Sequence, residues 1–137
     1  MSRPGVDLVE FVTARIAEDE DVAKRAAFGW GGEWSAAERS VFGPTDAEDD
    51  WSVVHADGKL DMVQSEDGDV CGHIARWDPA RVLAEIEAKR RIVLAYIQCP
   101  SDMEERDDGL SGAVSALASA WSTHPDYDPG WLARWPS

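Results

Sequence analysis

The sequence contains few cysteines and no long apolar run. Two cysteines in 137 residues do not make a disulfide framework, and in a reducing compartment both should be free thiols. No stretch of 18 consecutive apolar residues and no apolar N-terminal segment occurs. We therefore predict neither a signal peptide nor a membrane span, and we expect a cytoplasmic protein.

Basic residues are also scarce. Thirteen Lys and Arg stand against 27 Asp and Glu, which gives a formal net charge of −14. Direct binding to nucleic acid or to an anionic membrane is disfavoured, because both need a basic surface. Hydrophobic residues make up 44% of the chain and seven residues are Trp, so the chain is not a disordered acidic tail. Residues 31–70 carry a net −9, whereas residues 71–98 carry a net +2.

The length predicts a single small acidic domain over residues 1–137, which can bury about two-thirds of its surface. Apolar residues at spacings of three and four predict a long N-terminal helix over 7–27. Asp78 and Pro79 are a strong helix start, and Pro100 ends the long central helix that follows. A shorter helix is predicted over 110–121, and a turn-rich tail up to residue 137 should dock Tyr127 and Trp131 on the core.

A period of two begins at residue 51 and predicts a three-stranded antiparallel meander. Its strands fall at 51–55, 60–64 and 70–75, with Asp-Gly turn signals between them. The pattern of residues 35–50 is ambiguous: residues 35–39 are compatible with the start of a short helix, which Gly43 and Pro44 would end. The fold class is therefore α+β, with the central helix packed on the sheet. The expected contacts join strand and helix side chains, namely Val53, Met62 and Val70 with Leu83, Ile86, Val93 and Ile97.

Three segments resemble a known family. They are residues 7–20, the run HIARWDPARVL from His73 into EAKRRI, and the HPDY of residues 124–127 followed by Trp131. In this order they resemble an uncharacterised family of small acidic proteins from actinobacteria and their phages. The resemblance implies no established activity, ligand or catalytic residue. Members of the family often carry His at the position of Trp77, and this departure disfavours a metal site here.

The acidic stretches are the first candidate binding surface. Closely spaced carboxylates can mimic duplex phosphates, and exposed Trp residues make strong interface contacts. A basic partner protein would meet this surface. Its predicted residues are Asp46, Glu48, Asp49, Asp50, Glu66 and Asp67.

A second candidate is an anion or small-ligand site where a predicted strand leads into the central helix. A helix N-terminus favours anions, and His73, Arg76 and Arg81 surround this one, with Asp78 as its cap. His124 and Asp126 are added to this site, because a His beside a carboxylate can act as a general base. No nucleophile motif accompanies them.

Metal binding is the third possibility. Thiolates and imidazoles are ligands that zinc prefers, and the candidates are Cys71, His73, Cys99 and His124. Their spacing forms no local chelate, so we predict no metal and no cofactor. The favoured hypothesis is a non-catalytic protein-binding or regulatory module with a basic nucleic-acid-binding protein as partner, and homodimerisation is an option. The alternative is a small zinc-binding protein or hydrolase that uses His73, His124 and Asp126.

Overall fold

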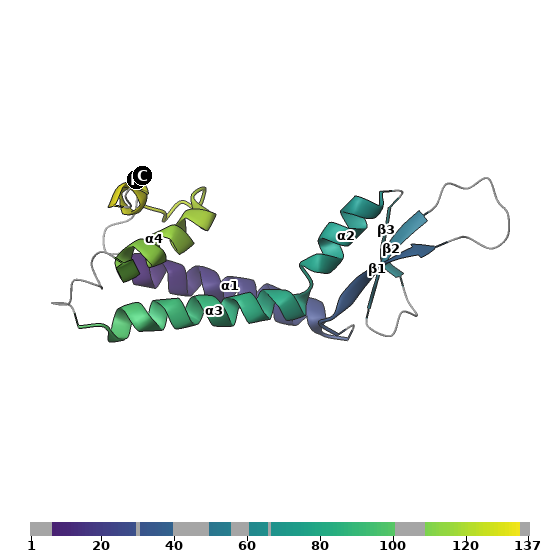
Figure 1. The fold of residues 1–137 in the computed structure, drawn as a ribbon, viewed down its shortest axis with the longest axis horizontal. Helices are drawn as coiled ribbons and strands as arrows, with labels where there is room; N and C mark the ends of the chain where they lie inside the picture. The colour runs from purple at the N-terminus through teal and green to yellow at the C-terminus, as the bar shows by residue number, and fades with distance from the viewer. Residues whose placement is uncertain are drawn as a thin grey trace. The chain divides into compact units, whose positions relative to one another are not determined.

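The computed structural model describes residues 7–29, 31–39, 50–55, 61–65, 67–100 and 109–134. The chain divides into two compact units. We name Met1–Asp19 with Glu85–Ser137 the helical unit, and Glu20–Ala84 the sheet unit. Helices α1 (Leu8–Ala27) and α3 (Pro79–Gln98) each contribute residues to both units (Figure 1). The α+β class is confirmed.

Helix α1 begins and ends at the signals that the sequence carries. The Asp7 Oδ1 atom accepts a hydrogen bond from the Glu10 N–H at 2.7 Å and so caps the helix. The helix gives way to Gly29 and Gly31, whose φ angles of +85° and +79° lie in the left-handed region that glycine adopts readily. The buried apolar side chains of α1 lie on one side of the helix: Leu8, Phe11, Val12, Ile16 and Ala23.

The C-terminal part of the helical unit contains α4 (Ser111–Ala118) and the 3₁₀ helices η2 (Ser119–Trp121) and η3 (Pro129–Arg134). The predicted helix over 110–121 is confirmed, with its last turn in 3₁₀ form. Figure 1 shows α4 beside the first turns of α1.

Phe11 on α1 is the centre of the helical unit's aromatic core. Its ring centroid lies 5.1 Å from that of Trp131 and 5.9 Å from that of Tyr127. Trp121 and His124 also contact this ring edge-on, at 6.5 Å and 5.4 Å. Tyr127 and Trp131 are 7% and 5% exposed, so the predicted docking of the tail on the core is confirmed.

The sheet unit holds three antiparallel strands in the order β1-β2-β3. They are β1 (Trp34–Arg39), β2 (Asp50–His55) and β3 (Asp61–Ser65), with a register irregularity between Val53 and Val54. The predicted strands at 51–55 and 60–64 are confirmed as β2 and β3. The ambiguity at 35–39 is resolved in favour of a strand and against the short helix, because these residues pair with β2 along the whole of β1.

The strand predicted at 70–75 is also wrong, since Gly68–Arg76 form helix α2. Asp67 caps this helix, with its side chain accepting the Asp69 N–H at 2.8 Å. Cys71 and Ala75, four residues apart, are buried on the side that packs on the sheet. In so short a run, alternation and helical spacing use the same residues, and packing on the sheet decides the outcome.

Helix α2 takes the place that was predicted for the central helix. It contacts all three strands, and its core with Val53 is bordered by Trp34, Ala36, Trp51 and Ile74. The central helix buries Ile86 and Val93, which belong to the helical unit. Of the predicted contact residues, Val53 is fully buried, whereas Val70 and Ile97 are 45% and 51% exposed. The Met62 side chain lies outside the described residues.

Within the described residues, no helix combines the length and the apolarity that crossing a bilayer requires.

Candidate functional site

The helical unit has an apolar hollow between α1 and α3, with a volume of about 290 Å³. Its floor includes Ile16 and Val93, which are 2% and 6% exposed. Leu94 and Ile97 stand at its edge and are 50% and 51% exposed. The full lining is Thr13, Ile16, Arg90, Val93, Leu94 and Ile97.

Most of the residues that line this hollow are apolar. Four of them are aliphatic, and Arg90 is the one charged residue among those that line it. Exposed aliphatic side chains grouped around a hollow mark a site for apolar groups of a partner. The hollow was not predicted from the sequence. The available signal was Leu94, an apolar residue that lies off the buried stripe of Ile86 and Val93.

Arg15, which is buried, and His124, which is partly buried, form a polar cluster in the same unit. Arg15 is 8% exposed, and its Nη2 atom donates to Glu18 Oε1 at 2.9 Å. Its Nη1 atom contacts His124 Nε2, and the Asp126 backbone N–H donates to His124 Nδ1 at 3.0 Å. A neutral imidazole has one acceptor nitrogen, so a given tautomer accepts one of these two bonds. The contact between Asp126 and His124 is made by the backbone N–H of Asp126.

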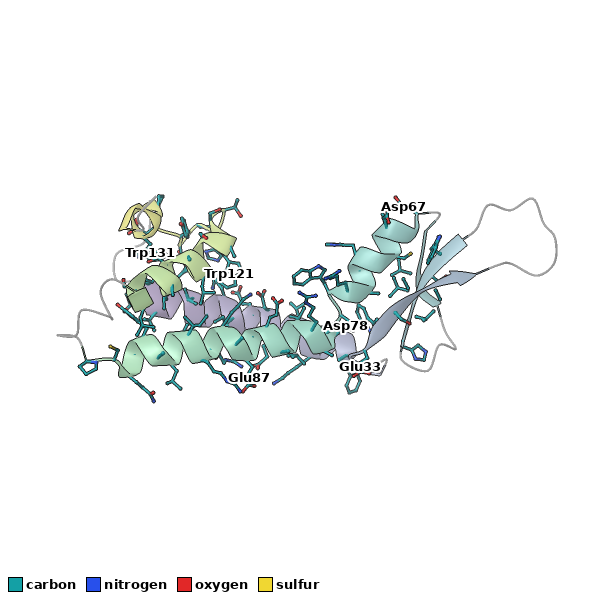
Figure 2. All side chains as sticks on the ribbon, viewed as in Figure 1. Glu33, Asp67, Asp78, Glu87, Trp121 and Trp131 are labelled. Carbon is teal, nitrogen blue, oxygen red and sulfur yellow. The ribbon has the colours of Figure 1, made fainter. Side chains whose placement is uncertain are left out.

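Asp19 lies near this cluster. Burial raises the pKa of its carboxyl above the ordinary value of 3.8, and the nearby charge of Lys89 partly opposes this shift. The Lys89 Nζ atom in turn lies 5.6 Å from the ring centroid of Trp121, a residue that is labelled in Figure 2. These contacts tie the middle of α3 to α1 and to the C-terminal segment within the helical unit.

The predicted anion site lies in the sheet unit at a corner between α2 and α3, not between a strand and a helix. Asp78, labelled in Figure 2, accepts hydrogen bonds from the Trp34 N–H at 3.0 Å and the Arg81 N–H at 2.8 Å. It thus caps α3 as predicted and also ties β1 to the corner. The Arg81 guanidinium lies 4.2 Å from the ring centroid of Trp77. His73 and Arg76 are exposed on α2.

The remaining residues of that predicted site lie in the other unit. His124 and Asp126 belong to the helical unit, whereas the residues of the α2–α3 corner belong to the sheet unit. Among the described residues, no three His, Cys, Asp or Glu side chains come together as a metal site. Cys71 is buried in the core under the sheet and Cys99 is partly buried after α3, and both are free thiols.

The predicted acidic surface falls mostly outside the described residues. Asp46, Glu48, Asp49 and Glu66 are not described. Asp50 begins β2, and Asp67 is the exposed N-cap of α2 (Figure 2).

Most of the described tryptophans serve the two cores. Trp131 is buried, Trp34 and Trp51 pack at the sheet core, and Trp121 contacts Phe11. Trp77 is 43% exposed.

The hollow and the two-unit architecture define a small α+β protein with an apolar surface site. The chain belongs to a family of unknown function, DUF6221, whose model matches residues 5–133. The resemblance to an uncharacterised family is confirmed to that extent, and the actinobacterial and phage origin stays a prediction. No curated protein and no solved structure matches the chain.

Proposed function

We propose that this chain is a non-catalytic protein-binding module whose helical unit receives a helix of a partner protein. The observation that carries the proposal is the apolar hollow between α1 and α3, with Leu94 and Ile97 half exposed at its edge. An amphipathic helix that lays its apolar face into such a hollow is a recurrent mode of recognition.

The charge of the chain favours a basic partner. The helical unit contains 13 acidic and seven basic residues, a net −6, and the whole chain carries −14. A field of this sign attracts a basic protein over distances up to about a Debye length, ~8 Å at physiological salt. The apolar contact then holds the complex. Because Arg90 lines the hollow, the partner side chain that faces it is uncharged or acidic.

Because charge acts on the encounter and the apolar contact acts on the formed complex, the proposal predicts how salt changes the association and dissociation rates. Screening slows the encounter of the −14 chain with a basic partner, so the association rate falls as salt rises. The apolar contact at Leu94 and Ile97 is not screened, so the dissociation rate changes little. The acidic residues predicted from the sequence, including Asp46, Glu48 and Asp49, would act through the association rate.

The test uses a labelled amphipathic helical peptide with Leu on one face and Lys on its flanks, and a matched peptide with Glu in place of Lys. We expect the Lys peptide to bind more tightly in fluorescence anisotropy. Leu94→Asp should raise the Kd of the Lys peptide by about tenfold or more, because it places a charge where the bound peptide would bury an apolar side chain. Ala95→Asp is the matched control, because it adds the same charge at the next exposed position of α3 and should leave Kd within about twofold.

Three outcomes contradict the proposal. They are tighter binding of the Glu peptide, no binding of either peptide, and equal losses for Leu94→Asp and Ala95→Asp. Sedimentation velocity adds an independent check, because a dimer that forms with rising concentration and is lost in Leu94→Asp would mean that a second copy of the chain occupies the hollow.

A further inference from the structure

His124 lies where the C-terminal segment of the helical unit meets α1. We name residues 122–134 the strap, because they carry Tyr127 and Trp131, which pack on Phe11. The His124 ring also contacts Phe11 edge-on, with 5.4 Å between the ring centroids. The His124 backbone carbonyl accepts the Tyr127 N–H at 3.0 Å. A movement of His124 therefore displaces the turn that carries Tyr127.

Both ring nitrogens of His124 face N–H donors. Arg15 Nη1 contacts Nε2, and the Asp126 backbone N–H donates to Nδ1 at 3.0 Å. A guanidinium and a backbone N–H can only donate, so a neutral imidazole, with its one acceptor nitrogen, satisfies one of these two contacts. An imidazolium has no acceptor nitrogen and satisfies neither of them.

A charged His124 ring would also stand against a second cation. Arg15 is always protonated, and because it is 8% exposed, water screens its charge poorly. The Arg15 Nη2 atom already donates to Glu18 Oε1 at 2.9 Å. Protonation of His124 in its present position therefore adds a like-charge contact as well as the loss of an accepted hydrogen bond.

The other charged groups around the strap do not restore these contacts. They are Glu18 and Asp19 on α1, Lys89 on α3, and Asp126 and Asp128 in the strap itself. A carboxylate pairs with an imidazolium N–H only where that N–H points, and both nitrogens of His124 point at donors. Pairing with a carboxylate therefore requires the ring to leave its place. Burial also raises the pKa of the Asp19 carboxyl, so this group loses its negative charge earlier during acidification than an ordinary carboxyl does.

We propose that the strap is acid-sensitive, and that protonation of His124 releases residues 122–134 from α1 and uncovers the ring of Phe11. Histidine gains its charge between about pH 8 and pH 5, so the strap is closed in neutral solution and opens in mild acid. An opening that takes up one proton shifts the equilibrium between closed and open strap by up to about tenfold per pH unit. This switch goes beyond the proposed function and uses no residue of the hollow.

Amide hydrogen exchange followed by NMR tests the switch, with each rate divided by the intrinsic rate at the same pH. The informative amides are those of Asp126, Tyr127 and Trp131, which donate to His124 Nδ1, the His124 carbonyl and the Asp128 carbonyl. We expect their protection to fall by about tenfold or more from pH 7.5 to pH 5. Amides in the middle of α3 should change by less than about twofold, which distinguishes local opening from global unfolding.

His124→Gln removes the titrating ring and keeps a side chain that can accept a hydrogen bond. The protection of its strap should be the same at pH 7.5 and pH 5 within about twofold. His73→Gln is the matched control, because His73 is exposed on α2 in the sheet unit, and it should keep the pH dependence of the wild type. In the wild type, the ring C–H resonance of His124 should shift over the same pH range in which the strap loses protection.

Three results overturn the proposal. They are a strap that stays protected while His124 titrates, a loss of protection that follows another group in place of His124, and a pH dependence that persists in His124→Gln. The wild-type titration decides the matter even where the strap of His124→Gln is already open at pH 7.5, because it needs no variant. Leu94 and Ile97 are unchanged in these variants, so failure here is distinguishable from failure of the hollow to bind a peptide.

Discussion

The helical unit and the sheet unit centre their cores on side chains of different size. The helical unit surrounds Phe11 with four aromatic rings. The sheet unit buries Val53, Cys71 and Ala75 beneath larger residues at its border. Both are acidic, with net charges of −6 and −8, so charge does not distinguish them. The volume of the core side chains does distinguish them, and it determines which substitutions each unit tolerates. A core of large rings loses most when a ring is removed, and a core of small residues loses most when an atom is added.

The largest effect is expected from Phe11→Ala. Removing the central ring should lower the free energy of unfolding by about 3–5 kcal/mol, because four aromatic contacts are lost and a cavity remains. Urea denaturation followed by circular dichroism measures this. Phe28→Ala is the matched control, because Phe28 is 85% exposed, and its change should stay within about 0.5 kcal/mol. Equal effects of the two variants would mean that Phe11 is not the centre of this core.

Adding an atom, instead of removing a ring, tests the packing of the sheet unit. A Cβ atom at Gly68 would lie 2.6 Å from the ring of Trp51, whereas one at Gly72 meets nothing within 4 Å. Gly68→Ala should therefore destabilise by about 1–3 kcal/mol through overpacking. Gly72→Ala should stabilise by about 0.5–1 kcal/mol, because alanine is the better helix former. Thermal unfolding of both variants gives the signs, and two changes of the same sign would contradict this packing.

The smallest effect concerns Asp19 in the helical unit. Because burial raises the pKa of this carboxyl in the folded chain, the folded state binds its proton more tightly than the unfolded state does. This group therefore lowers the free energy of unfolding as pH rises from below 3.8 through the folded pKa. Asp19→Asn removes this titrating group. The free energy of unfolding of the variant, relative to that of the wild type, should therefore rise as pH increases. Urea unfolding of both proteins from pH 3 to 6 tests this, and a constant difference would contradict it.

Local signals predicted the ends of elements well. Asp78 caps α3 as expected, and Pro100 follows the end of α3. In each case a side chain acts within a few residues of its own position, which is the range over which sequence patterns carry information.

The predictions that were wrong or missing concern residues whose structure depends on contacts far along the chain. The run at 70–75 fits a strand and a helix equally, and contacts with the sheet decide for the helix. Residues 35–39 became a strand through pairing with β2. Arg15 and His124 lie 109 positions apart, and no local spacing joins them. The hollow was missed for the same reason, since finding it requires knowing which sides of α1 and α3 the C-terminal segment covers.

The path of the chain through the two units has a consequence for synthesis. The sheet unit is one continuous stretch, Glu20–Ala84, whereas the helical unit combines residues from both sides of it. On the ribosome, the whole of the sheet unit emerges before most of the helical unit has been made. Phe11 must wait for Tyr127 and Trp131, so the aromatic core closes only after every residue of the sheet unit has been synthesised.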